Sequence, residues 1–107
     1  RAQARSEISP RVQEKTGRLG HAAGRITIRD TKSRWGSCSH DGNLWFCWRW
    51  VMAPAQVLDY VVAHEVAHLA ELNHGPKFWR WVEELTADVE GAKKWLRLNG
   101  EALHRYG

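Results

Sequence analysis

Cysteine is scarce in this sequence, with only 2 residues in 107, and no stretch approaches the roughly 18 consecutive apolar residues that a membrane helix needs. Two cysteines are too few for a disulfide scaffold, and no signal peptide precedes the first residue, so we expect a cytoplasmic protein with no membrane partner. With 43% hydrophobic and 26% charged residues, the chain is neither disordered nor fibrous. These absences indicate one soluble, folded domain.

Several functional signatures are missing as well. The sequence has no internal repeat, no interdomain linker, no glycine-rich loop that would cradle a phosphate, and no recognised nucleic-acid-binding motif. It begins with Arg1 rather than with Met, so we expect the 107 residues to be the C-terminal part of a longer protein.

Hydrophobic periodicity predicts the element order α-β-β-β-α-α-α. A charged helix is expected over residues 2–18, followed by strands from residue 25 and over about 33–39. A third strand should carry Leu44, Phe46, Trp48, Trp50 and Met52 on one face and form a hairpin with the second. Helices follow over 53–72, from residue 76, and over 88–98. The expected fold is α+β, with a small three-stranded antiparallel sheet packed on a central helix and further helices.

The central predicted helix contains the segment His64-Glu65-Val66-Ala67-His68. Residues four apart lie on one face of a helix, so both imidazoles can bind the same metal ion. Zinc prefers nitrogen ligands in a tetrahedral arrangement, and a helix supports two of them rigidly. Glu65 is rotated by roughly 100° from His64, which places its carboxylate beside the ion, where it can accept a proton from water. The segment predicts a zinc site with Glu65 as general base.

A third protein ligand is needed, and His74 is the leading candidate. In an unbroken helix it would lie about 9 Å beyond His68 along the axis and on another face. The neighbouring residues Asn73, Gly75 and Pro76 are typical of a helix end, so the chain can fold back between the two histidines. The residues typical of a helix end and the geometry needed for a third ligand therefore both predict that the chain bends between His68 and His74.

Other ligand sets stay open at this point. An acidic third ligand could come from Glu83, Glu84 or Asp88, as in some zinc peptidases. Cys38 or Cys47 could instead fill the fourth position and produce a closed structural site with no place for water. The two cysteines lack a close C-x-x-C pairing, which favours buried thiols over ligands.

The combined motifs resemble the YgjP-like metallopeptidase domain, which is related to SprT-like zinc proteases. The likeness extends over residues 25–100, and it is carried by Arg34-Trp35-Gly36-Ser37-Cys38-Ser39, Asn43, Trp48-Arg49, Ala53-Pro54, Leu58-Asp59-Tyr60-Val61-Val62, His64-Glu65, His68, Asn73-His74 and Phe78-Trp79. It implies a zincin-like fold with zinc on His64, His68 and His74 and with Glu65 catalytic. It also implies that residues 1–107 form a single metallohydrolase domain, preceded by a further region in the intact protein.

The sequence departs from the family pattern at a few positions. Gly75 stands where the family usually has Ser, and Trp45 and Cys47 stand where small polar residues are usual. Trp45 could therefore alter the substrate groove if its strand face borders the site. We name Trp35 and Trp45 as candidate substrate-binding residues.

These features predict a zinc-dependent metallopeptidase that cleaves peptides or unfolded proteins. One alternative keeps the metal but takes a nucleoside triphosphate as substrate, since hydrolysis of nucleotide phosphoanhydrides has also been ascribed to this group. Another is a non-catalytic zinc- or nucleic-acid-binding module. Both draw on the basic first half, where residues 1–53 hold 10 basic and 4 acidic groups. An oxyanion donor could be Arg34, His40, Tyr60 or Tyr106, and spacing does not select among them.

Overall fold

The computed structural model describes residues 2–31 and 35–104. Its elements are α1 (Ala2–Leu19), β1 (Ile26–Arg29), β2 (Gly36–Cys38), β3 (Leu44–Cys47), the 3-10 helix η1 (Trp48–Met52), α2 (Ala55–Ala67), α3 (Pro76–Leu85) and α4 (Val89–His104). This order confirms the predicted α+β succession, with η1 as an addition. None of the helices in the described ranges has the length and apolarity needed to cross a membrane.

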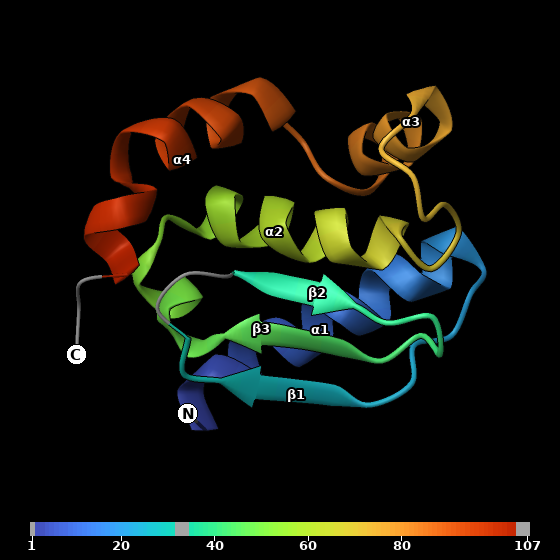
Figure 1. Cartoon of the computed structure of the whole chain (residues 1–107), viewed down its shortest axis with the longest axis horizontal. Coiled ribbons are helices and arrows are strands. Elements are labelled where there is room, and N and C mark those ends of the chain that lie inside the picture. Colours follow the sequence, from blue (N-terminus) through green and yellow to red (C-terminus); the bar gives the residue numbers. More distant parts are fainter. Residues whose placement is uncertain (1, 32–34, 105–107) are drawn as a thin grey trace.

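Helix α2 occupies the centre of the molecule. The small sheet lies on one side of it, helices α3 and α4 lie on the other, and α1 runs behind the sheet and α2 (Figure 1). The apolar residues of α2 that the periodicity singled out are at most 4% exposed, among them Val57, Leu58, Val61, Val62 and Val66. Each such side chain contributes about 1.5–3 kcal/mol by leaving water, so α2 is the element around which the others pack.

The sheet is mixed, which corrects the expectation of an antiparallel one. β2 and β3 form the predicted antiparallel hairpin, in which Ser37 lies opposite Trp45. Gly42 turns the hairpin with a φ of 81°, which glycine adopts without strain. β1 pairs with β3 in parallel, giving the order β1-β3-β2. Alternation of apolar and polar residues along a strand shows which face is buried, but it does not show whether the neighbouring strand runs parallel or antiparallel. The sequence pattern therefore could not predict the parallel pairing of β1 with β3.

The third strand is shorter than predicted. It ends at Cys47, and the chain continues as η1, so only Leu44 and Phe46 of the expected row lie on β3. Trp50 is nevertheless fully buried, and its indole N–H donates to the carbonyl oxygen of Trp35 at 2.9 Å. An alternating aromatic pattern is compatible with a strand or with a short tight helix, and in the helix the Trp50 indole makes this partly buried hydrogen bond.

Two predicted helix ends also differ from the structure. α2 ends at Ala67, and Leu69 and Ala70 donate to carbonyls three residues back instead of four. α4 passes through the expected stop at residues 99–100. The Asn99 amide donates to the Trp95 carbonyl one turn back, so it supports the helix rather than capping it.

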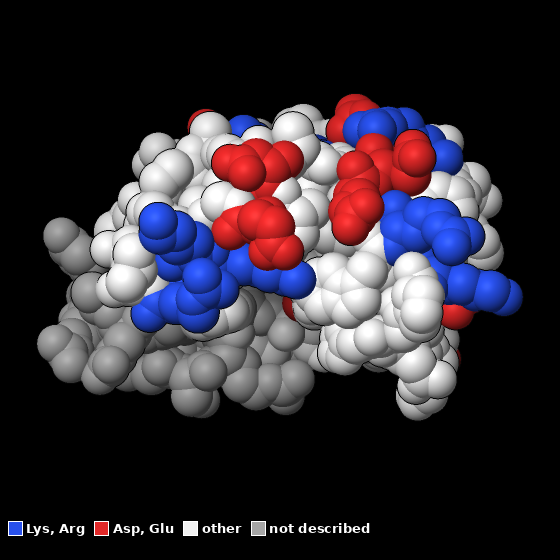
Figure 2. Space-filling model, turned by 90° about the horizontal axis from the view of Figure 1, so that it is seen from above, with Lys and Arg blue, Asp and Glu red and all other residues white. Residues whose placement is uncertain are grey.

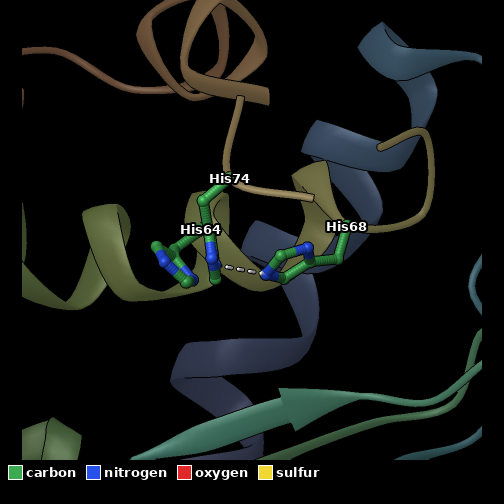
Figure 3. A group of neighbouring side chains, drawn as sticks. All are labelled: His64, His68 and His74. Atoms are coloured by element: carbon green, nitrogen blue, oxygen red, sulfur yellow. Dashed lines mark hydrogen bonds between the residues drawn. The ribbon is translucent and has the colours of Figure 1, made fainter. Parts of the chain in front are cut away.

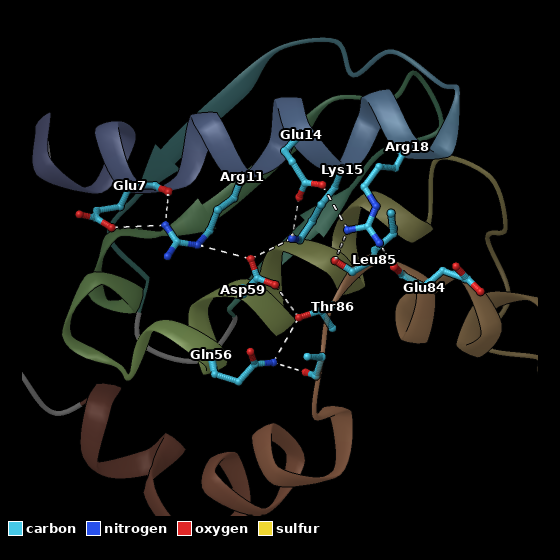
Figure 4. A network of polar contacts seen from close by, with 11 residues as sticks. Glu7, Arg11, Glu14, Lys15, Arg18, Gln56, Asp59, Glu84, Leu85 and Thr86 are labelled. Carbon is cyan, nitrogen blue, oxygen red and sulfur yellow. Dashed lines mark hydrogen bonds and ion pairs between the residues drawn. The ribbon is translucent and has the colours of Figure 1, made fainter.

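A polar network joins α1 to the N-terminal half of α2 and to the α3–α4 connection (Figure 4). The Lys15 ammonium, 2% exposed, lies 2.8 Å from the Asp59 carboxylate. The other oxygen of Asp59 accepts from the Thr86 hydroxyl at 2.5 Å, and Gln56 donates to the same hydroxyl at 3.2 Å. Arg18 adds bonds to the carbonyl oxygens at residues 84 and 85. A buried ammonium requires this carboxylate, because its desolvation is otherwise uncompensated.

We therefore expect Asp59→Asn to lower the free energy of unfolding by about 2–3 kcal/mol, since it leaves the buried Lys15 ammonium with only the half-exposed Glu14 carboxylate, 3.4 Å away, as a counterion. Lys15→Met should cost less, because it removes the buried charge itself. Urea titration of the metal-free proteins measures both values. Equal stability of Asp59→Asn and the unaltered chain would contradict the role given to this pair.

Candidate metal centre

Three imidazoles converge at one point of the structure. His64 and His68 project from α2, and His74, in the connection to α3, reaches back over them (Figure 3). One ring nitrogen from each lies within 4.8 Å of the other two. The Nε2 atoms of His68 and His74 are 3.1 Å apart. The chain thus brings together the three histidines that the sequence nominated, at a spacing that could hold a metal ion.

The turn after α2 brings His74 back to the two histidines of the helix. The Nδ1–H of His68 donates to the carbonyl oxygen of Glu71 at 3.0 Å, inside the tight turn that ends the helix. This bond fixes the tautomer, so that Nε2 of His68 carries a lone pair, which is directed at His74 Nε2. Burial lowers the pKa of His68, which favours the neutral ring that metals bind. The donor chemistry of the site therefore fits a metal ion.

Two aromatic side chains in the first turn of α3 enclose the histidines. Phe78 stacks on His68 with ring centroids 4.4 Å apart and an interplanar angle of 28°. The Trp79 ring lies 5.9 Å from His64 and 6.3 Å from His74. Both are among the motifs of the family resemblance, but no role at the site was assigned to them from the sequence. Helix α3 starts at Pro76, just beyond His74, and these two residues lie in its first turn. This short distance in sequence from His74 is the signal that could have predicted their contact with the rings.

Glu65 lies at the edge of a cavity of about 320 Å³ beside the histidines. The cavity is lined by Gly36, Ser37, Cys38, His64, Glu65, His68, Leu72 and His74. Glu65 is 8% exposed, and its Oε2 lies 3.3 Å from His64 Nδ1. A Cβ atom on Gly36 would stand 2.9 Å from the Trp45 carbonyl oxygen and 3.4 Å from Glu65 Cγ. The backbone of β2 can therefore lie this close to the Trp45 carbonyl of β3, beside Glu65, only with glycine at position 36, a constraint that the sequence analysis missed.

Cys38 lines the same cavity but does not join the group of ligand atoms. Its Sγ donates to the Ser39 carbonyl oxygen at 3.5 Å. Burial, assisted by the negative charge of Glu65, raises the pKa of this thiol to about 11, so it stays protonated at neutral pH. Cys47 is fully buried near Thr31. Within the described residues, neither thiol belongs to the group formed by His64, His68 and His74.

The acidic candidates for the third ligand lie elsewhere. Glu83 and Asp88 line a different cavity, between α3 and α4. Glu84 faces outward from α3 beside Lys77 and Arg80. Within residues 2–31 and 35–104, His74 is the side chain that completes a group with His64 and His68.

The two candidate substrate-binding tryptophans lie outside the lining of the histidine cavity. Trp35 is 37% exposed and packs edge-on against Trp50 at 5.4 Å. Trp45 lies on β3, where the Arg29 guanidinium stands 5.0 Å from its ring centroid. Their role in substrate binding stays a prediction.

Of the two candidate oxyanion donors that the structure describes, Tyr60 lies beside the site. It stands one turn before His64 on α2, and the two ring centroids are 6.1 Å apart. Burial raises the pKa of Tyr60 to about 12, with help from Glu90 and Glu65, so its hydroxyl remains a donor at neutral pH. His40 is exposed in the hairpin turn. Arg34 and Tyr106 lie outside the described residues.

The model of the YgjP-like metallopeptidase domain matches residues 1–99. The chain belongs to this family. The YgjP-like chain is accordingly a metallopeptidase, and its family implies a divalent metal ion and a peptide or protein substrate. No curated protein sequence matches it significantly.

Two solved structures share the fold of this YgjP-like domain. Both are crystal structures of metallopeptidase zymogens, abylysin of Pyrococcus abyssi and jannalysin of Methanocaldococcus jannaschii. Abylysin aligns with a TM-score of 0.72 over 88% of this chain and 93% of its own. Jannalysin aligns with a TM-score of 0.70 over 89% and 96%. Both are 23% identical to this chain, so the likeness concerns the fold and confirms the expected zincin-like α+β architecture.

We expect His74→Ala to weaken zinc binding by more than about 100-fold, because loss of a ligand should exceed the 10–100-fold effect of an outer partner. His40→Ala is the matched control, since it removes an exposed imidazole outside the group. Competition with a chromophoric chelator measures both affinities. An unchanged affinity in His74→Ala would transfer the third-ligand role to another residue.

Proposed function

We propose that the domain is a zinc-dependent peptidase in which His64, His68 and His74 hold the ion and Glu65 is the general base. The observation that carries the proposal is the convergence of three imidazoles beside a mostly buried carboxylate at an open cavity. Three neutral nitrogen donors with one position left for water are the ligand pattern of catalytic rather than structural zinc. When bound, zinc would supply Lewis acidity that lowers the pKa of water to about 7 and polarises a carbonyl group.

Glu65 moves the protons in this proposal. Its carboxylate faces the cavity, where one oxygen can accept a proton from the attacking water. The same carboxyl group can then pass that proton to the leaving nitrogen of the cleaved amide. Such a relay contributes typically 10²–10⁴-fold to the rate. The contact with His64 and the close approach of β2 at Gly36 restrict the carboxylate to this position.

The neighbouring strand offers a means of binding an extended peptide. β2 pairs with β3 along one edge, and residues 36–38 line the histidine cavity. An edge strand can donate and accept backbone hydrogen bonds with an added strand, which holds a chain without demanding a particular sequence. A peptide bound along β2 would pass beside Glu65.

The alternative substrates receive less support. Among the residues that the structure describes, those lining the histidine cavity include no lysine or arginine, so nothing in this described lining favours a polyphosphate. The free thiols Cys38 and Cys47 support the cytoplasm as the compartment in this proposal.

We expect Glu65→Gln to retain stoichiometric zinc and to lower kcat for peptide hydrolysis by 10²-fold or more, on the order of the general-base contribution. Glu84→Gln, on the outer face of α3, serves as the matched control and should keep its activity. Zinc is measured by elemental analysis, and turnover by cleavage of an unfolded protein and of UTP. Full peptidase activity in Glu65→Gln would refute the assigned role, and turnover of UTP alone would favour the nucleotide alternative.

A further inference from the structure

A second cavity, of about 450 Å³, opens between α3 and α4. It is lined by Trp79, Glu83, Thr86, Ala87, Asp88, Val89, Glu90 and Lys93. Trp79 also belongs to the aromatic surround of the metal centre, where its ring lies 5.9 Å from that of His64. The indole therefore borders both the metal centre and this cavity.

The ammonium group of Lys93 already lies over the Trp79 ring. The ammonium of Lys93 lies 3.9 Å from the ring centroid, well inside the roughly 6 Å within which a cation–π interaction acts. Indole is the best aromatic surface for such contacts. Lys93 lies on α4, across the cavity from α3, and its side chain extends to the Trp79 ring. The position of its ammonium therefore shows where this cavity stabilises a positive charge.

The remaining charges of the cavity favour a cation too. Asp88 is occupied in capping α4, because its carboxylate accepts from the Gly91 N–H at 3.1 Å. Glu83 and Glu90 form no ion pair within the described part of the chain. The single ammonium of Lys93 therefore shares the cavity with two carboxylates that it does not neutralise. Seen from the side of α3 and α4, acidic side chains gather in the middle of this face, with basic ones flanking them (Figure 2).

We propose that Trp79 is a specificity-determining residue which, together with Glu83 and Glu90, receives a lysine or arginine side chain of the peptide substrate. The inference rests on the proposed peptidase function and adds the substrate class. A basic side chain would lie on the indole face and displace Lys93 towards solvent. An acidic side chain would meet two unneutralised carboxylates and be rejected.

The test compares two peptides that differ at one position. Otherwise neutral peptides carry either lysine or its uncharged isostere norleucine, and the substituted position is scanned along the peptide around the scissile bond. At the position that enters the cavity, kcat/KM should be about 5- to 30-fold higher for lysine than for norleucine. Both peptides are measured on the same variant, so a general loss of activity lowers both values and leaves their ratio unchanged. This control is needed because Trp79 also contacts the proposed metal-binding histidines.

Substitutions should change this ratio in opposite directions. Trp79→Phe should lower the ratio and Trp79→Leu should bring it close to 1, because the cation–π contact weakens and then vanishes. The double variant Glu83→Gln, Glu90→Gln should lower it as well. Lys93→Met should raise it, because the competing ammonium is gone. Higher salt should reduce the preference of the unaltered protein but leave norleucine peptides unaffected.

A lysine-to-norleucine ratio near 1 at every position, or one that Trp79→Leu leaves unchanged, would overturn the proposal. Failure of the peptidase function itself would be distinguishable, since it would abolish turnover of both peptides. In that case, the same pair is titrated into zinc-loaded Glu65→Gln protein by calorimetry. Preferential binding of the lysine peptide that is lost in Trp79→Leu supports the subsite, and equal binding of the two peptides refutes it.

Discussion

Three imidazoles can share one ion only if the helix that carries two of them stops before the third. An α-helix fixes the separation of His64 and His68, but it would carry a residue six positions later away from them. The tight turn after Ala67 removes this conflict. His68 takes part in that turn, because its Nδ1–H binds the Glu71 carbonyl while its Nε2 faces His74. One side chain thus links the end of α2 to the orientation of a proposed ligand.

The rest of the molecule holds this arrangement from several sides. The first turn of α3 places Phe78 on the rings, and β2 approaches Glu65 at a glycine. At the far end of α2, the pair of Lys15 and Asp59 joins α1 to the helix and, through Thr86, to the α3–α4 connection. That connection also borders the acidic cavity beside Trp79. The same contacts that stabilise the fold therefore position both the metal centre and the proposed subsite.

Local signals in the sequence were enough to predict much of this. The HExxH spacing and the helix end before Pro76 predicted which histidines meet, and the sequence pattern predicted the four α-helices and the three strands. Features set by tertiary contacts could not be read in the same way. The parallel pairing of β1, the 3-10 helix at Trp50 and the stacking of Phe78 on His68 each depend on a residue distant in sequence. The early end of α2 depends on a side-chain bond that periodicity does not register.

The most direct test of the central claim is X-ray absorption spectroscopy of the zinc-loaded protein. The account predicts three imidazole nitrogens at about 2.0–2.1 Å and one further oxygen from water, the pattern of an open catalytic site. The Glu65→Gln variant should give the same spectrum, because the carboxylate is not assigned as a ligand. A sulfur neighbour at about 2.3 Å, or only two imidazoles in the first shell, would contradict the account.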